Sequence, residues 1–504
     1  MHIDPQDYEE HSSHKEKATP LPKMQIFIIM LVMLAEPISS TVIYPFVNQF
    51  VRDTGITGGD ERKVGHYAGF IESAFFLAEC TTVFHWGRLS DRIGRRPVLL
   101  LGPIGLAASL FTFGFSNSFW TLLIARCAQG AFNGNIGVTK TMVTEITDST
   151  NIAQAYAWLP VMWSSGITLG PLIGGLFAQP ARRWPQLSNI KFLVHHPYFL
   201  PCAIAGMLAL TSFLMAYMGL KESLRPKDIL CQTDDADESG KAIYDSDYSS
   251  GEESPLLSND LPRKYGSHPT EDSSSEISTL APIEKEIPLK DLLTRPLLIA
   301  LANHAFLAFL DQAHQAILPL MYSTSISLGG LSLRPRDIGL VMGVWGAFNA
   351  VLQVVFFSRI MKWLGPRTMY ITCFSALLVT FSAFPVLNML SKTTGSTNAM
   401  VWITICFQMT FYVAVFMGYG SIFMYVTASA PNKRSLGATN GLSQMTVSIA
   451  RAIGPALSTS LFSYSVQKNI LGGYGVYLCM TVLSLLGLTL AVRLPEHVWE
   501  EKEV

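Results

Sequence analysis

The stretch HWGRLSDRIGRRPVLLLG, residues 85–102, connects two long apolar runs through a short turn that contains one acid and several arginines. A turn of this length lets two helices reverse direction tightly. Asp91 and the arginines can form charge-assisted hydrogen bonds to helix ends or to another part of the fold. Short loops rich in Lys and Arg stay on the cytosolic side of a membrane. The stretch therefore predicts a pair of membrane-spanning helices joined on the cytosolic side.

The composition also indicates a membrane protein. The chain has 504 residues, of which 49% are hydrophobic and 14% are charged, whereas soluble domains contain roughly 25% charged residues. The net charge of -1 and the lack of a basic stripe argue against a nucleic-acid partner. The seven cysteines are scattered without paired spacing, so we expect neither a disulfide framework nor a zinc site.

Long apolar runs divide the chain into two sets of helices. A membrane core about 30 Å thick needs about 20 apolar helical residues. Twelve runs approach that length: 24–48, 65–86, 97–115, 118–140, 157–178 and 198–219, and then 296–322, 336–358, 367–388, 399–428, 437–463 and 474–493. The predicted fold is an all-α membrane protein with twelve transmembrane helices in two six-helix pseudo-symmetric halves.

The polar segments complete the predicted domain organisation. The first residues lack the pattern of a secretory signal, and the middle segment is rich in Asp, Glu and Ser, so we expect it to be disordered. With twelve spans, both termini and this linker face the cytosol. The predicted domains are a cytosolic tail at 1–23, a six-helix half at 24–220, the linker at 221–295, a second six-helix half at 296–494 and a cytosolic tail at 495–504.

The two halves have similar sequences at corresponding places. WGRLSDRIGRRP (86–97) corresponds to FSRIMKWLGPRT (357–368), which aligns Gly94 with Gly365 and Arg96 with Arg367. GITLGPLIGG (166–175) corresponds in the same way to ARAIGPALST (450–459). Two repeated halves related by an axis along the membrane normal are typical of transporters.

The loop between the second and third runs resembles the signature of the major facilitator superfamily, G-x-L-a-D-r-x-G-r-[RK]. The matching residues are Gly87, Leu89, Asp91, Arg92, Gly94, Arg95 and Arg96. This resemblance implies a cytosolic gating latch that opens when a carrier changes its side of access. The second-half copy has Lys362 in place of the acid, which weakens the case for a latch there. The alternative is a loop that only anchors the protein by its positive charge.

Two further motifs narrow the resemblance. LLIARCAQGAFNGNIGVTK (122–140) resembles the R-x-x-Q-G motif of proton-coupled facilitators and places Arg126, Gln129 and Asn133 on one helical face. The alternative is an arginine that reaches the membrane interface. The fifth run is similar to the G-x-x-x-G-P-x-x-G-G signature of drug:proton antiporters, although a packing role alone would use the same spacing. Its matching residues are Gly166, Gly170, Pro171, Gly174 and Gly175.

The wider sequence identifies a subgroup by resemblance. VRDTGI (51–56), the second run with its loop, and LGATNGLSQMTVSIARAIGP (436–455) resemble the zinc-induced-facilitator-like group and its fungal relatives. This group belongs to the drug:proton antiporter family with twelve spans. The extra Cys and His motifs of its plant members are not clear here. Transport of zinc chelators is therefore not assumed.

Glu36 is an acid near the middle of the apolar stretch LVMLAEPISSTVIYP (31–45). Pro37 frees a backbone carbonyl one turn earlier, and such a partly polar helix belongs beside a water-filled cavity. Arg126 is its predicted partner, and we expect Glu36 and Arg126 to form the central charge pair. Glu79 and Asp311 are secondary candidates for proton coupling. Alternatively, Glu36 is a fixed counter-ion that never releases its proton.

The seventh run places His304, Asp311 and His314 within about a third of the helix circumference. A carboxylate flanked by imidazoles can bind a metal, carry protons or hold a cation, but each His can equally be a structural hydrogen-bonding residue. We predict no metal site and list Gln129, Asn133, His304 and His314 as candidate cavity residues. Arg451 is a candidate partner for one of the acids, or a residue that stabilises the cytosolic side.

The linker contains EESPLL (252–257), in which Glu252, Leu256 and Leu257 resemble an acidic dileucine sorting signal. Its alternative is a chance match in a segment rich in Ser and Glu. Sorting adaptors use such signals to direct proteins to vacuoles, lysosomes or endosomes. The predicted location is the vacuolar or the plasma membrane.

The predicted function is secondary active transport of a small organic solute across the lipid bilayer, with proton-coupled antiport. The protein would act as a monomer without a cofactor, and the proton gradient would drive it. A membrane-embedded enzyme lacks a nucleophile motif such as GxSxG, so we predict no enzyme activity. A transporter-derived sensor that signals through the linker is the remaining alternative. The substrate stays open.

Overall fold

The computed structural model describes residues 19–148, 151–156, 158–223, 292–431 and 435–496. These residues form helices and no strands. The N-terminal part contains α1 (Lys23–Thr41), α2 (Val47–Asp53), η2 (Glu61–Lys63), α3 (Val64–Ile93), α4 (Arg95–Phe115), α5 (Phe119–Asn133), α6 (Ile136–Glu145), α7 (Ile152–Tyr156), α8 (Trp158–Phe177), α9 (Pro180–Arg183), η3 (Pro185–Leu187), α10 (Lys191–His195) and α11 (Phe199–Gly219).

The C-terminal part contains fewer and longer helices. They are α14 (Arg295–Ser323), η4 (Ile326–Leu328), α15 (Pro335–Thr394), α16 (Ala399–Ala428), α17 (Leu436–Gln467), η5 (Ile470–Gly473) and α18 (Gly475–Ala491). α15 bends at Gly365, whose φ of 75° is not helical. It therefore covers two of the predicted runs, 336–358 and 367–388.

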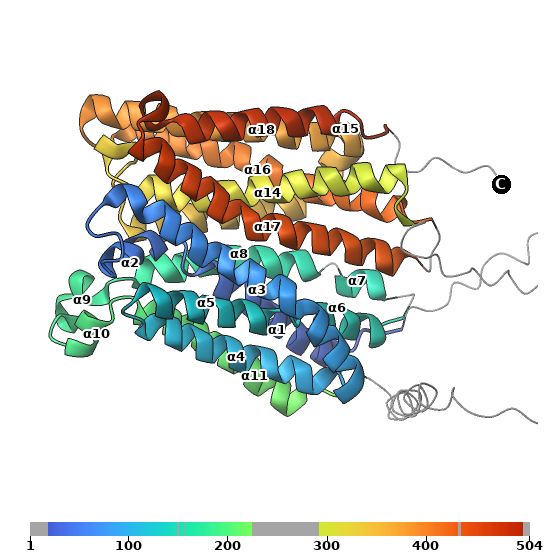
Figure 1. The fold of residues 1–504 in the computed structure, drawn as a ribbon. Helices are drawn as coiled ribbons and strands as arrows, with labels where there is room; N and C mark the ends of the chain where they lie inside the picture. Colours follow the sequence, from blue (N-terminus) through green and yellow to red (C-terminus); the bar gives the residue numbers. More distant parts are fainter. Residues whose placement is uncertain (1–18, 149–150, 157, 224–291, 432–434, 497–504) are drawn as a thin grey trace, which may run out of the picture.

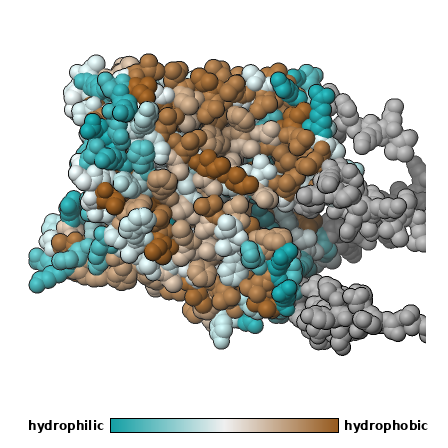
Figure 2. Space-filling model, viewed as in Figure 1, coloured by the Kyte–Doolittle hydropathy of each residue, from teal (hydrophilic) through white to brown (hydrophobic). Residues whose placement is uncertain are grey.

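Figure 1 shows the two sets of helices as bundles that lie side by side, with most helices running nearly parallel. α6 and α7 lie at one end of the molecule, here called the α7 end. α2, α9 and α10 lie at the opposite end, here called the α2 end. The space-filling view in Figure 2 has a broad apolar band between hydrophilic patches at the two ends. Such a band is the surface that a helical membrane protein presents to lipid.

Seven helices within the described residues are long and apolar enough to cross a membrane, judged by length and composition. Every predicted apolar run also overlaps a helix. The predicted run 118–140 is not continuous, however, because α5 ends at Asn133 and α6 begins at Ile136. The intervening Gly134 and Asn135 favour helices weakly. Gly134 also packs closely against Trp86, since an added Cβ would lie 2.7 Å from that side chain.

The first predicted run, 24–48, ends earlier than expected. α1 stops at Thr41 although the apolar sequence continues. Pro45 explains this end, because a proline ring clashes with the carbonyl four residues earlier, which here belongs to Thr41. The helix resumes as α2 at Val47. The last carbonyls of α1 are thus left near the middle of the bundle without partners in their own helix.

Two close helix pairs join the bundles. α3 packs on α17, where a Cβ added to Gly69 would lie 2.8 Å from the Pro455 carbonyl. α8 packs on α15, where a Cβ added to Gly175 would lie 2.7 Å from the Gly339 Cα. Four hydrogen bonds join the bundles within the described residues. Arg52 donates to the Ser323 carbonyl, Gln467 donates to the Arg62 carbonyl, Gln312 donates to the Tyr44 hydroxyl, and the Ala456 amide donates to the Ser73 hydroxyl. The bundles are therefore held together between the middle of the molecule and the α2 end.

Candidate functional site

Arg126 is fully buried on α5 and binds the end of α1. Its guanidinium donates to the Ser39 carbonyl at 3.3 Å and to the Ser40 carbonyl at 2.8 Å. It also donates to Gln129 Oε1 at 2.6 Å and lies 4.4 Å from the centroid of the Phe75 ring. A cation at a helix C-terminus is stabilised by the carbonyls exposed there. The early end of α1 thus supplies the ligands of this arginine.

The predicted contact between Glu36 and Arg126 requires correction. No ion pair within 4.0 Å joins these two residues in the described part of the chain. Arg126 instead interacts electrostatically with Tyr44 and, among the carboxylates, chiefly with Glu72 of α3. The reason is depth. At 1.5 Å per helical residue, Glu36 lies about 20 Å from the α7 end, whereas Arg126 and Glu72 each lie about 30 Å from it.

Glu72 shares one face of α3 with Glu79, although only Glu79 was predicted as a coupling acid. It is buried, and its Oε2 has no hydrogen-bond partner within the described residues. Its spacing of seven residues from Glu79 places the two acids on one face of α3. The seven-residue spacing was the sequence signal for both acids, but it does not indicate which of them lies closer to Arg126.

Glu36 belongs to a different group of charges, here called the central charge cluster: Glu36, Glu79, Lys140, Asp311 and Arg451. Glu36 of α1 is buried and lines a small pocket together with Asn133. Its electrostatic interactions are with Glu79 of α3, Lys140 of α6 and Arg451 of α17. Asn133, predicted as a cavity residue, lines this pocket beside Glu36, and its buried Nδ2 has no hydrogen-bond partner within the described residues. The cluster therefore combines side chains from the two bundles.

Asp311 anchors the C-terminal side of the central charge cluster. Its Oδ1 accepts a hydrogen bond from Tyr412 at 2.6 Å, and its Oδ2 accepts bonds from Tyr419 at 2.9 Å and Gln315 at 3.1 Å. Arg451 interacts electrostatically with Asp311 and Tyr419 in its own bundle and with Glu79 in the other. The Arg451 side chain thus interacts with acids of both bundles. Protonation of such an acid therefore changes the electrostatic attraction between the two bundles.

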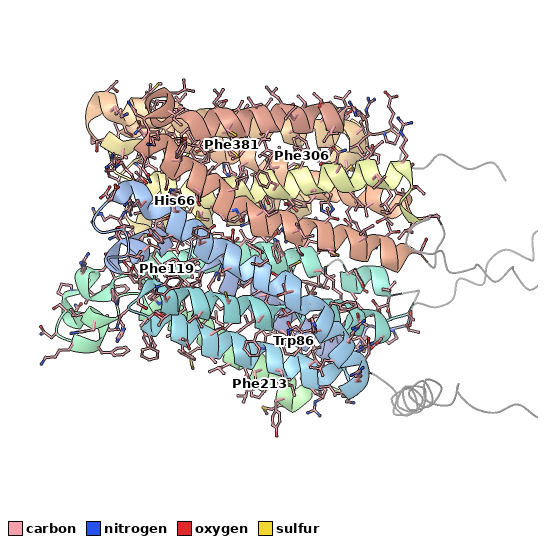
Figure 3. All side chains as sticks on the ribbon, in the orientation of Figure 1. His66, Trp86, Phe119, Phe213, Phe306 and Phe381 are labelled. Carbon is pink, nitrogen blue, oxygen red and sulfur yellow. The ribbon has the colours of Figure 1, made fainter. Side chains whose placement is uncertain are left out.

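The two histidines of α14 have different surroundings. His304 Nδ1 lies 2.8 Å from the Ser443 hydroxyl, with which it can share a hydrogen bond. Neither ring nitrogen of His314 has a hydrogen-bond partner within the described residues. Its ring packs against Tyr412 at 4.0 Å between centroids and against Phe381 at 5.6 Å, the latter labelled in Figure 3. The described residues contain no group of three His, Cys, Asp or Glu side chains that could hold a metal.

The predicted gating loop forms a network within the N-terminal bundle. Arg95 donates hydrogen bonds to Asp91, to the Ser90 hydroxyl at 2.7 Å and to Glu145 of α6 at 3.0 Å. The Arg95 and Arg96 backbone amides donate to Glu222 at 2.8 and 3.0 Å. None of these described contacts reaches the C-terminal bundle.

The remaining loop residues have simpler roles in the structure. Gly94 separates α3 from α4 with a φ of 100°, a conformation that L side chains rarely adopt. Arg92 is exposed, and a Cβ added to Gly87 would meet open space. The loop therefore owes its order to Asp91, Gly94, Arg95 and Arg96.

The glycine motif of α8 lies between α1 and α15. Added Cβ atoms at Gly166, Gly170 and Gly174 would collide with Pro37, Thr41 and the Val42 carbonyl of the α1 segment, whereas Gly175 faces α15 of the other bundle. Pro171 also faces α15, since a Cβ added to Gly339 would lie 2.5 Å from its carbonyl. These positions let α8 approach both neighbours closely. The predicted sorting signal at Glu252, Leu256 and Leu257 lies outside the described residues.

Two helical bundles, an apolar outer band and a charge cluster between the bundles define a multi-pass integral membrane protein of the two-bundle carrier type. The chain belongs to the Major Facilitator Superfamily, whose family model matches residues 29–455. This membership confirms the resemblance of the gating loop and the predicted fold class. It also supports transport rather than catalysis.

Individual relatives agree with this assignment. The chain is 31% identical over 498 residues to the Major facilitator-type transporter psiT2 of Psilocybe cyanescens, covering 95% of this chain and 91% of that protein. It is 26% identical to the protein ZINC INDUCED FACILITATOR-LIKE 1 of Arabidopsis thaliana, covering 94% and 91% respectively. The predicted resemblance to the zinc-induced-facilitator-like group is thus confirmed. The crystal structure of a D-xylose-proton symporter shares the fold, with a TM-score of 0.66, 15% identity and coverage of 95% of this chain and 99% of that one.

Proposed function

We propose that this superfamily member moves a small organic solute by alternating access and exchanges it for protons, in export or in vacuolar sequestration. The observation that carries the proposal is the position of Arg451 at the boundary between the bundles, where its guanidinium lies 5.8 Å from the centroid of the Trp163 ring of the other bundle. There it interacts electrostatically with Asp311 in its own bundle and with Glu36 and Glu79 in the other. Opposite charges across a boundary attract only while the acids are ionised. Protonation therefore weakens an electrostatic attraction between the bundles, and deprotonation restores it.

The contacts between the bundles support a rocking movement about this point. The hydrogen bonds from the Ala456 amide to the Ser73 hydroxyl and from Gln467 to the Arg62 carbonyl lie toward the α2 end. The hydrogen bonds of the described gating-loop residues at the α7 end stay within their own bundle. In the predicted orientation, with the α7 end in the cytosol, this arrangement corresponds to a carrier closed on the far side. Arg126 and Glu72 lie deeper and would hold α3, α5 and α1 as one unit during the movement.

The proposal is tested by measuring how the two bundles move with pH. Spin labels replace Arg88 and Arg359, which are exposed at corresponding positions of the two bundles, in a chain without its natural cysteines. Acidification should shift the measured label-to-label distances toward longer values, because protonated acids no longer attract Arg451. Glu36→Gln combined with Glu79→Gln should abolish this pH response. Glu61→Gln is the matched control, since Glu61 is exposed near the α2 end.

A distance distribution that does not change with pH, or one that changes equally in the double Gln variant, would contradict proton coupling through these acids. In liposomes with an internal pH dye, the same double variant should stop solute-driven proton movement. Arg126→Ala tests the predicted role of the deeper arginine in the same assay. Intact proton movement in both variants would remove these residues from the coupling mechanism.

A further inference from the structure

A second pocket lies between the two bundles and is separate from the small pocket beside Glu36. It is here called the central pocket. Its lining includes Tyr44 and Pro171 from the N-terminal bundle and His314, Trp345 and Tyr412 from the C-terminal bundle. Met342 and Met409 also contribute to its wall. Residues from both bundles meet here, so a molecule bound in the pocket would contact both moving parts.

The central pocket is lined by flat aromatic surfaces. The rings of Trp345 and Tyr412 are stacked with centroids 4.8 Å apart and an interplanar angle of 25°. The His314 ring lies 4.0 Å from Tyr412 at an angle of 32°. Aromatic rings and methionine sulfur atoms bind flat apolar ligands through stacking and sulfur contacts. The shape and chemistry of the wall thus favour an aromatic ligand over an aliphatic one.

Two buried polar groups in this wall lack partners within the described residues. They are the ring nitrogens of His314, which is 0% exposed, and the Nε1–H of Trp345, which is 6% exposed. Such groups cost free energy when they are buried without a hydrogen bond. The Trp345 N–H can only donate, whereas a neutral imidazole offers one donor and one acceptor. A ligand hydroxyl could accept a hydrogen bond from the Trp345 N–H or exchange one with the His314 imidazole, and either bond would satisfy one of these groups.

The nearest acid does not offer a free charge to a ligand. Asp311 already accepts hydrogen bonds from Tyr412, Tyr419 and Gln315, and it interacts with Arg451. Among the described residues, the lining of the central pocket contains no Asp, Glu, Lys or Arg, although Thr41 and Gln315 also contribute to it. A neutral ligand fits these surroundings better than a cation or an anion, because an unpaired buried charge is costly.

We propose that the central pocket binds a neutral, flat aromatic solute with a hydroxyl or a similar group that both donates and accepts hydrogen bonds. His314 and Trp345 recognise that group, and the rings of Trp345 and Tyr412 hold the aromatic face. The proposal rests on the proposed transport function and specifies its class of substrate.

The test compares three probes of similar size that bind the purified full-length protein in lipid nanodiscs without any gradient. 2-Naphthol has an aromatic face and a hydroxyl, naphthalene has only the face, and 2-decalol has the hydroxyl without the flat face. We expect the wild type to bind 2-naphthol about five- to tenfold more tightly than either of the other probes, as one or two buried neutral hydrogen bonds imply. Equal binding of 2-naphthol and 2-decalol overturns the proposal.

Variants then separate stacking from hydrogen bonding. His314→Phe and Trp345→Phe keep an aromatic surface and should each reduce 2-naphthol binding about threefold or more while leaving naphthalene binding unchanged. Retained naphthalene binding also shows that each variant is folded. His314→Gln keeps a donor and an acceptor and should recover part of the loss. His66→Phe and Trp363→Phe are the matched controls, because these residues do not line the central pocket.

Unchanged 2-naphthol binding in both Phe variants would overturn the assignment of the pocket. That result would not contradict the pH-dependent movement of the bundles, so only the proposed substrate class would be refuted. Conversely, selective 2-naphthol binding with no pH response would leave the pocket assigned and remove proton coupling. The two proposals can therefore fail separately.

Discussion

The two bundles turn between consecutive helices at corresponding glycines, Gly94 with a φ of 100° and Gly365 with a φ of 75°. Two residues later, each bundle has an arginine that binds the end of its own last long helix. Arg96 donates to the Tyr217 carbonyl at 2.9 Å, and Arg367 donates to the Val492 carbonyl at 2.8 Å. These shared contacts show that the turn and its helix-end arginine belong to the repeated architecture.

The charge network beside the turn differs between the bundles. In the N-terminal bundle, Arg95 connects Asp91 with Glu145. The aligned positions in the C-terminal bundle hold Lys362 in place of Asp91 and Pro366 in place of Arg95. Proline has neither a side-chain donor nor a backbone amide to contribute. The backbone turn is therefore common to both bundles, whereas the charge network is specific to the N-terminal bundle. Only that network is a candidate for gating.

The largest expected effect comes from breaking the network that the second bundle lacks. Arg95→Ala removes hydrogen bonds to Ser90, Asp91 and Glu145 and should lower the free energy of unfolding by about 2 kcal/mol, the range for a partly buried charged hydrogen bond. Lys362→Ala is the matched control in the other bundle. This exposed residue should change stability by less than about 0.5 kcal/mol. Chemical denaturation in detergent micelles measures both, and equal effects would refute a network specific to one bundle.

Alanine at the two turn glycines tests the part that the bundles share. Both substitutions place an L side chain at a positive φ, which costs about 1 kcal/mol. At Gly94 the new Cβ would also lie 2.6 Å from Glu222 Oε2, whereas at Gly365 it would meet open space. We expect a loss of about 2 kcal/mol for Gly94→Ala and about 1 kcal/mol for Gly365→Ala. Gly87→Ala, in open space without a positive φ, is the control in the same denaturation series.

The same two turns show what the sequence could predict. The apolar runs, the aligned glycines and the paired arginines are local patterns, and they predicted the helices and the repeated architecture. The sequence did not predict that Glu222, beyond the sixth run, would bind the backbone of Arg95 and Arg96. Such a contact depends on where the last helix ends relative to the first turn, which no local pattern encodes.

The sequence predicted only part of the candidate site, because local patterns do not encode contacts between distant segments. The sequence identified Glu36, Arg126 and Asp311 as buried charges because ionisable residues in apolar runs are rare. It paired Glu36 with Arg126, but the described residues show no ion pair between them, because Arg126 reaches α1 about one turn beyond Glu36. The early end of α1 at Thr41 further changed the partners, because it offered backbone carbonyls to Arg126.

The smallest expected effect concerns the carboxylates that close the two turns. Glu222 accepts hydrogen bonds from the first amides of α4, which lie at a helix N-terminus. Glu222→Gln removes the negative charge but keeps one acceptor, so we expect a loss of about 1 kcal/mol. Glu496 pairs with Arg367 at 2.6 Å but is 75% exposed. Glu496→Gln should therefore cost less than about 0.5 kcal/mol.

Salt distinguishes these two carboxylates. The exposed pair of Glu496 with Arg367 is screened at about 1 M salt, where the Debye length falls to about 3 Å, so the effect of Glu496→Gln should vanish there. The effect of Glu222→Gln should persist in part, because its oxygens bind backbone amides directly and the hydrogen bonds do not depend on long-range charge. Denaturation at low and high salt checks both variants. If salt reduced both losses of stability equally, the Glu222 contact would be an ordinary surface charge pair. The hydrogen bonds from the backbone amides to Glu222 would then not distinguish the N-terminal turn.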